Sequence, residues 1–266
     1  MKEVILSRLK DIEKEHDIKI LYACESGSRT WGFESKDSDW DVRFIYTHSL
    51  PWYMSVSRMN NVDMRDCIEY PLEEETNLDI NGWDLSKALY LLYKSNCPLI
   101  EWLNTPLIYK KNTEFYIEIR NLTNKLYSRS QALYHYYHMT NRNINEYLKD
   151  KNIVWTKKYI YILRTLLACI WIEKYSEPIP VKFQDLICML SSCFNNEENA
   201  QMFKLLSDKI NGAELGREPK NVILNGLIYR EIDKIKNVTL DKFKGNRDND
   251  KSALKDLDMM FFKYAI

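Results

Sequence analysis

The sequence predicts an α+β fold, in which a half built from helices and strands precedes an all-helical half. Short apolar runs of strand character lie at 18–24 and 41–47, and further runs lie at 66–71 and 77–81. From about Tyr109 onward, apolar residues instead recur at the 3.6-residue period of an amphipathic helix. With 7 glycines and 7 prolines in 266 residues, the composition argues against long disordered stretches between these elements.

Helices accompany the strands of the first half. Residues 3–16 interleave apolar and charged side chains as a helix does, and a short helix is expected over 50–57. Asp84 directly precedes the apolar run 85–94, where its carboxylate can accept backbone N–H groups and cap a helix. Pro98 then begins another short helix.

In the second half, the sequence pattern predicts mainly helices. One long helix is expected near 119–149, and another near 155–175 ends before Pro178. The later elements are helices at about 183–194, 197–211 and 219–236, a polar loop at 244–251 and a last short helix. Within the helix near 155–175, the residues expected to be buried are Ile160, Leu163, Leu167, Ile170 and Trp171.

The charge balance, the cysteine spacing and the apolar runs indicate which partners and which cellular location to expect. Lys and Arg together number 38, as do Asp and Glu, so the net charge indicates no nucleic-acid partner, although a local basic surface stays possible. The six cysteines form no Cys-x-x-Cys pair and have no His at zinc spacing, which favours buried free thiols. No signal-peptide core and no membrane-length apolar run is present, so we expect a cytoplasmic protein without a membrane partner.

A short polar motif contains the candidate catalytic residues. Gly27-Ser28 follows the first strand, and ten residues later Asp39-x-Asp41 leads into the second strand. Because side chains alternate along a strand, Asp39 and Asp41 are expected to point to the same face. Two such carboxylates repel unless a cation lies between them, and hard oxygen ligands suit Mg²⁺ with substrate phosphates. The alternative is a solvated turn at 36–39, which a lone Asp-x-Asp would favour.

The motif is similar to that of a known superfamily. Gly-Ser, a gap of about ten residues and Asp-x-Asp resemble the signature of the DNA polymerase β-type nucleotidyltransferases. The strings at 27–33 and 38–44 resemble one branch more closely, the predicted nucleotidyltransferases found beside RNA ligases in bacteria and phages. Segments at 82–89 and 94–103 match the same branch, and 157–164 does so more weakly.

This resemblance implies a domain organisation. A polymerase β-like catalytic domain with a mixed sheet would occupy residues 1–108. A helical domain at 109–266 would close the cleft for nucleotide and acceptor.

The resemblance also implies a third carboxylate on a neighbouring strand, which positions or deprotonates the attacking hydroxyl. Asp79 fits, because it lies in the middle of an apolar run whose other residues are expected to face the core. Glu69 and Asp84 are the alternatives. Asp39, Asp41 and Asp79 are therefore the expected metal ligands and catalytic residues.

The motif turn is expected to bind the nucleotide. Ser28 would hydrogen-bond the triphosphate together with the backbone N–H of Gly27, because small residues permit close approach. Arg29 is a further candidate in the same turn. Arg43, two residues past Asp41, can either neutralise a carboxylate or contact phosphate.

Three residues of the helical half are also nucleotide-binding candidates. Lys157, Tyr161 and Arg164 share one face of their helix, where cations can hold the β- and γ-phosphates of a nucleotide. The alternative for this face is a solvated helix flank.

The activity implied is transfer of a nucleoside monophosphate from an NTP to a hydroxyl, with two Mg²⁺ ions for which Mn²⁺ can substitute. The expected acceptor is an RNA 3′ end, as in RNA repair or tRNA tailing. The alternatives are nucleotidylation of a protein or small molecule, and a nucleotide-sensing or RNA-binding module without turnover. A basic strip with exposed aromatics would favour RNA, whereas a closed polar pocket would favour a small acceptor. The sequence leaves the NTP and the oligomeric state open.

Overall fold

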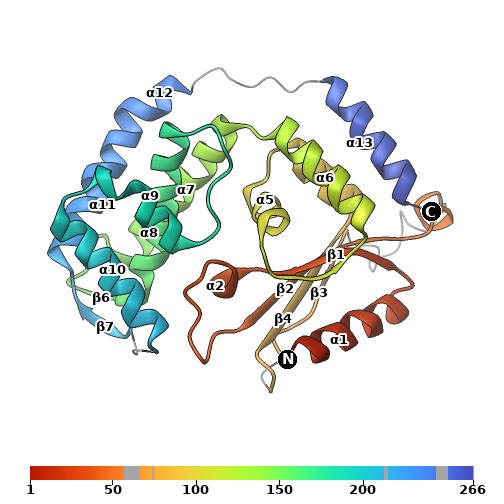
Figure 1. Ribbon diagram of the computed structural model, residues 1–266, viewed down its shortest axis with the longest axis horizontal. Helices are drawn as coiled ribbons and strands as arrows, with labels where there is room; N and C mark the ends of the chain where they lie inside the picture. The colour runs from red at the N-terminus through yellow and green to blue at the C-terminus, as the bar shows by residue number, and fades with distance from the viewer. Residues whose placement is uncertain (57–65, 74, 213–214, 244–250, 266) are drawn as a thin grey trace. The chain divides into compact units, whose positions relative to one another are not determined.

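The computed structural model describes residues 1–56, 66–73, 75–212, 215–243 and 251–265 (Figure 1). The chain forms two compact units. The sheet unit comprises Met1–Thr30, Asp39–Tyr127 and Asp248–Ile266. The helical unit comprises Trp31–Ser38 and Ser128–Arg247.

The sheet unit is built on a mixed five-stranded sheet with the order β3-β4-β2-β1-β5. Strand β2 pairs with β4 in parallel, and the other neighbouring strands are antiparallel. The strands are β1 (Lys19–Glu25), β2 (Trp40–Thr47), β3 (Cys67–Glu69), β4 (Leu78–Asp84) and β5 (Ile108–Lys111). The predicted α+β class with a mixed sheet, followed by a helical region, is confirmed.

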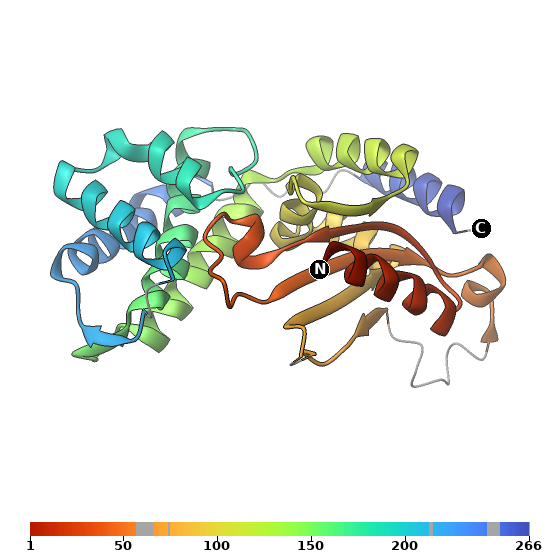
Figure 2. The same ribbon diagram turned by 60° about the horizontal axis from the view of Figure 1, so that its bottom comes forward.

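Helices cover both faces of this sheet. Helix α1 (Lys2–Glu15) packs Ile5, Leu9 and Ile12 on one face, and its other side carries charged residues. Figure 2 shows red α1 on one side of the strands and the yellow-green and blue helices α6 and α13 on the other. The helices of that second face are α4 (Leu85–Tyr93), α5 (Cys97–Asn104), α6 (Thr113–Leu126) and α13 (Lys251–Tyr264).

Alternation along β2 and β4 decides which side chains face which layer. Val42 and Phe44 of β2 pack in the cluster with α1, as do Leu78 and Ile80 of β4. Ile45 packs in the cluster with α4, α5 and α6. The side chains between the α1-facing residues therefore point to the opposite face of the sheet, and these include Asp41 and Asp79.

The helical unit is arranged around α8 (Thr156–Lys174), in which 13 of 19 residues are buried. All five residues that we expected this helix to bury are buried. The other helices are α7 (Arg129–Tyr147), α9 (Phe183–Leu190), α10 (Asn196–Ile210), α11 (Val222–Lys234) and α12 (Leu240–Lys242), with a 3₁₀ turn η2 (Ser191–Cys193) and a π-helical turn η3 (Ile235–Thr239). Two short strands, β6 (Ile153–Trp155) and β7 (Arg217–Pro219), pair antiparallel.

Several predicted elements are wrong in detail. The long helix near 119–149 is two helices, because the Ser128 hydroxyl accepts the N–H of Gln131 and caps a new helix. Strands β5, β6 and β7 were not predicted, since each has only three or four residues. The exposed thiol of Cys188 contradicts the expectation that all cysteines are buried.

Other expectations lie partly outside the described residues. Helix α3 (Leu50–Tyr53) is shorter than the expected 50–57, and residue 57 is not described. Most of the expected loop at 244–251 is likewise not described. Within the described residues, no helix is long and apolar enough to cross a membrane.

We expect Gly82→Ala to destabilise the protein by about 1–3 kcal/mol, because overpacking a filled core forces its neighbours to shift. A Cβ atom at Gly82 would lie 2.1 Å from Cε2 of Phe44, whose ring is fully buried. Urea-induced unfolding followed by circular dichroism measures the change.

The matched control is Gly226→Ala in α11, where an added Cβ would meet open space beyond the backbone of its own helix. Alanine is the better helix former, so this variant should gain about 0.5–1 kcal/mol. Equal effects at both glycines would contradict the packing that we describe around Phe44.

Candidate active site

Asp41 and Asp79 lie side by side on the sheet. The parallel register pairs Asp41 with Asp79 and, next to them, Val42 with Ile80. Because Val42 and Ile80 are fully buried beneath the sheet, the two aspartates point to the opposite face. Neighbouring strands are about 4.8 Å apart, so the structure brings two carboxylates together from strands that are distant in sequence.

The guanidinium of Arg43 bridges these carboxylates. Its Nη2 lies 3.1 Å from Oδ1 of Asp41 and 2.7 Å from Oδ2 of Asp79. Its Nη1 donates to the carbonyl oxygens of Val42 and Asp79, at 3.0 Å each. Arg43 therefore offsets one of the two negative charges of the pair, and neutralising a carboxylate is one of the two roles that the sequence left open.

Burial and the neighbouring charges perturb Asp41. Burial raises its pKa, the positive charge of Arg43 opposes that rise, and the negative charges of Asp79 and Asp39 add to it. The ionised form of Asp41 is therefore less favourable in the folded protein than in the unfolded chain. A cation that approaches this carboxylate stabilises the ionised form.

The motif turn approaches Asp41 through Gly27. Gly27 begins the short helical turn α2 (Gly27–Thr30) with φ +60, in the left-handed region that disfavours other residues. A Cβ atom there would lie 1.9 Å from Oδ2 of Asp41. Only glycine allows the backbone to lie this close to the carboxylate, and half-buried Ser28 follows it in the turn.

Glu25 is a residue of this site that the sequence analysis missed. It is fully buried, and its carboxylate accepts the backbone N–H of Asp41 at 2.9 Å and the hydroxyl of Tyr109. Burial raises its pKa, and these two hydrogen bonds oppose the rise. One signal was present in the sequence, because Glu25 is the only charged residue after Lys19 in an otherwise apolar run that leads into the motif.

Asp39 and Arg29 lie beside the pair. Asp39 is exposed and directly precedes β2, and its negative charge acts on Asp41. Arg29 donates to the carbonyl oxygen of Asp39 at 3.0 Å, and its guanidinium carbon lies 3.6 Å from the ring centroid of Trp40. These contacts connect the motif turn to the start of β2.

The two alternatives for the third carboxylate lie elsewhere in the sheet unit. Asp84 is buried at the start of α4, where it accepts the N–H of Ser86 and the hydroxyl of Tyr53, as the predicted helix cap. Glu69 is exposed on β3, and its partner in the register is Asn81. Of the three candidates, Asp79 is the one that lies beside Asp41.

The remaining predicted site residues belong to the helical unit. Lys157 is exposed, and Tyr161 contacts Trp31 and Phe33 edge to face. Arg164 is only 4% exposed, and its guanidinium carbon lies 4.2 Å from the ring centroid of Trp31. This contact shows that the face of α8 is not simply a solvated flank at Arg164.

The donor chemistry of the carboxylate pair suits a divalent cation. Asp41 and Asp79 offer hard oxygen ligands and already share one cation, the guanidinium of Arg43. Among the described residues, no group of three or more His, Cys, Asp or Glu side chains is already arranged to hold a metal ion. A metal ion at this pair would therefore compete with Arg43 for the same oxygen atoms.

We expect Arg43→Gln to lower the free energy of unfolding by about 1–2 kcal/mol, because it removes charge-assisted hydrogen bonds and leaves two adjacent carboxylates. Asp41→Asn should leave stability near that of the parent at pH 7 without metal. In the parent, the pKa of Asp41 is higher in the folded protein than in the unfolded chain. Ionisation of Asp41 therefore lowers stability increasingly as pH rises toward the folded-state pKa, and asparagine removes this loss.

Urea unfolding of both variants and of the double variant measures these effects. In the double variant the repulsion is absent, so it should be more stable than Arg43→Gln alone. An Asp41→Asn loss as large as that of Arg43→Gln would mean that the carboxylate is needed for folding.

Comparisons with known proteins bear on this arrangement. The family model for the RNA repair pathway DNA polymerase beta family matches residues 1–263. A protein of Bacillus subtilis (strain 168) named "Uncharacterized protein YcgL" is 41% identical over 235 residues, which are 88% of this chain and 86% of that protein. No solved structure gives a significant match. The chain, with its mixed sheet, Gly-Ser turn and paired aspartates, belongs to the RNA repair pathway DNA polymerase beta family, a family of polymerase β-like nucleotidyltransferases.

Proposed function

We propose that this protein is a Mg²⁺-dependent nucleotidyltransferase that moves a nucleoside monophosphate from an NTP to a hydroxyl group. The observation that carries the proposal is the pair Asp41 and Asp79, held in register with the backbone of Gly27 against the Asp41 carboxylate. This arrangement combines oxygen ligands for a cation with a turn that a phosphate can approach closely.

The reaction forms a bond between the acceptor oxygen and the α-phosphorus, and breaks the bond from that phosphorus to the β-phosphate. Pyrophosphate leaves, and the proton of the acceptor hydroxyl passes to a carboxylate or to water. We propose that Asp39, Asp41 and Asp79 hold the two Mg²⁺ ions, for which Mn²⁺ can substitute. Bound divalent ions would supply positive charge at the attacking and leaving oxygen atoms.

The chain's own groups position the reactants. In this proposal, Ser28 and the backbone N–H of Gly27 bind the triphosphate. Asp79 accepts a hydrogen bond from the attacking hydroxyl and so orients it. Arg43 holds the carboxylates in place until a metal ion takes its position.

The candidates of the helical unit divide into two roles. Lys157 and Tyr161 are exposed enough to contact an NTP, because 37% of the Tyr161 surface is accessible and Lys157 is exposed as well. Arg164 is buried beside Trp31, so its proposed contribution is to hold the segment that follows the motif turn.

For the acceptor we propose an RNA 3′ end. The support is the family description, which places related polymerase β-like proteins in an RNA repair pathway. Cytoplasmic location and use of ATP as the NTP are parts of the same proposal.

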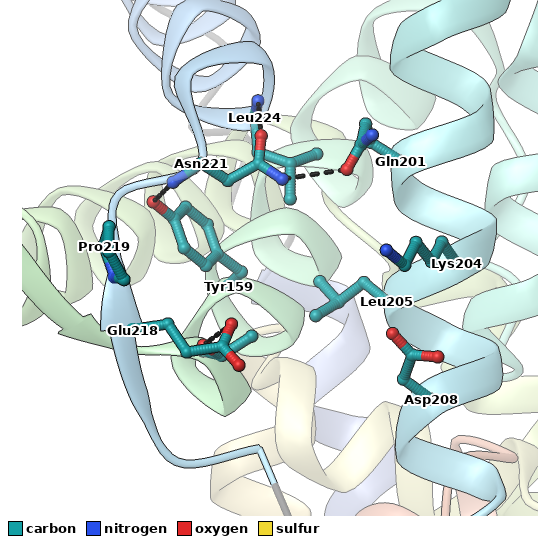
Figure 3. Close-up of a pocket in the computed structure, with 10 residues that line it drawn as sticks. Tyr159, Gln201, Lys204, Leu205, Asp208, Glu218, Pro219, Asn221 and Leu224 are labelled. Carbon is teal, nitrogen blue, oxygen red and sulfur yellow. Dashed lines mark hydrogen bonds between the residues drawn. The ribbon is translucent and has the colours of Figure 1, made fainter. Parts of the chain in front are cut away.

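One observation favours a small acceptor instead. The helical unit contains a polar cavity of about 170 Å³ (Figure 3). Its charged lining residues are Lys204, Asp208 and Glu218. Several of its other polar groups already bond to one another: the Tyr159 hydroxyl accepts the N–H of Asn221 at 3.2 Å, and the Asn221 amide donates to Gln201 at 2.8 Å. This internal pairing leaves few groups to recognise a ligand, so we favour RNA.

Incubation with each labelled NTP, Mg²⁺ and total cellular RNA and protein tests the activity. We expect Asp41→Asn and Asp79→Asn to lose at least about a hundredfold in label incorporation, because each removes a metal ligand. Glu69→Gln, a matched change on β3, should keep the parent's rate.

Label in the Asp41→Asn variant equal to that of the parent would refute the proposed transferase. A loss in Glu69→Gln would instead assign the third carboxylate to β3. On a denaturing gel, label that migrates with RNA supports the RNA acceptor, and label that migrates with protein or with a small molecule contradicts it.

A further inference from the structure

The short ribbon formed by β6 and β7 exposes aromatic and apolar side chains. Val154 is buried, whereas Ile153 is 61% exposed and Trp155 is 40% exposed. Their partners across the ribbon are Pro219 and Arg217, which are exposed as well. One face of the ribbon therefore carries an indole that a ligand can reach.

Two positively charged side chains lie close to this indole. The guanidinium carbon of Arg217 lies 4.9 Å from the ring centroid of Trp155, and Nζ of Lys157 lies 5.5 Å from it. Nearby on α8, Nζ of Lys158 lies 4.2 Å from the ring centroid of Tyr147. Aromatic rings alternate here with cations, as on surfaces that bind a single nucleic-acid strand.

Hydrogen bonds extend the pairing of the ribbon at both ends, and buried Val154 faces the helical unit's interior, so the indole is presented on a defined support. The N–H of Thr156 donates to the carbonyl oxygen of Gly216 at 2.9 Å, and the N–H of Lys220 donates to Asn152 at 3.1 Å. The carboxylate of Glu218 accepts the hydroxyl of Thr156 at 3.1 Å and lines the polar cavity, as Figure 3 shows. The nearest acidic group of the ribbon is thus engaged with Thr156.

Charge complementarity identifies the class of ligand. A partner protein that buried Trp155 in an apolar pocket would have to desolvate Arg217 and Lys157, which is costly without matched acidic groups. A single strand of RNA can both cover the indole and match the positive charges, because a base stacks on the indole and the adjacent phosphates contact the cations.

We propose that Trp155, Arg217 and Lys157 form a contact surface for single-stranded RNA. This inference rests on the proposed function, because it supplies the place where the helical unit holds an RNA acceptor. The surface needs neither NTP nor metal, so it is tested apart from the chemistry.

The test is fluorescence anisotropy of the full chain with a labelled single-stranded RNA of about 12 nucleotides, without Mg²⁺ or NTP. Stacking of one base predicts that Trp155→Ala weakens binding about 5- to 100-fold and that Trp155→Phe retains most of the affinity. The control is Tyr229→Ala, which removes an aromatic ring of similar exposure, 39%, from α11 and should bind as the parent does.

Arg217→Gln adds a readout specific to phosphate contact. The slope of log affinity against log salt concentration should fall by about 0.7, the value for one phosphate contact on a single strand. Trp155→Ala should leave that slope unchanged.

The proposed RNA contact surface would be refuted if Trp155→Ala bound RNA as tightly as the parent, or if the parent did not bind single-stranded RNA. The proposed transferase is judged separately by NTP labelling in Asp41→Asn. If RNA binding depends on Trp155 but the Asp41→Asn variant incorporates label as the parent does, the RNA contact surface is supported and the proposed transferase activity is refuted.

Discussion

The parallel pairing of β2 with β4 determines where the candidate site residues of the sheet unit lie. It sets Asp41 beside Asp79, although the two strands are separated along the chain by β3. Two carboxylates at this spacing repel each other, so the arrangement needs a cation between them, and Arg43 supplies one from the same strand. A slip of β4 by one residue in this register would turn Asp79 toward the apolar cluster beneath α1 and leave Asp41 without its neighbour. The site and the core therefore depend on the same pairing.

Two further contacts hold the motif turn against this pair. The buried carboxylate of Glu25 accepts the backbone N–H of Asp41, so the end of β1 and the start of β2 are joined by a side chain as well as by strand pairing. Tyr109 of β5 donates to the same carboxylate. Gly27 then allows the turn to lie against Asp41 itself. The backbone of Asp41 is thus held by a buried acidic group with no proposed part in the reaction.

Much of the sheet unit follows from local patterns in the sequence. The alternation and apolar runs predicted β1, β2 and β4, and Asp84 caps α4 as its position before the apolar run suggested. Asp79 was chosen because its neighbours had to face the core, and they do. The register that places it beside Asp41 depends on tertiary packing, which no local pattern contains. Strand β5 was assigned to the helical region because its four residues end in two lysines and show no strand alternation of apolar and polar side chains. Arg164 is buried in contact with Trp31, which is far away in sequence.

The path of the chain between Thr30 and Asp39 has a consequence for dissecting the protein. Residues 31–38 belong to the helical unit, yet both flanking segments belong to the sheet unit. In the helical unit, Phe33 is fully buried against Phe183, and Lys209 donates to Ser35 at 2.9 Å. A fragment that begins at Ser128 would lack these residues and expose the apolar surface that they cover. Neither half can then be expressed as an independent module by a single cut, and a circular permutant would have to keep the loop from 31 to 38 intact.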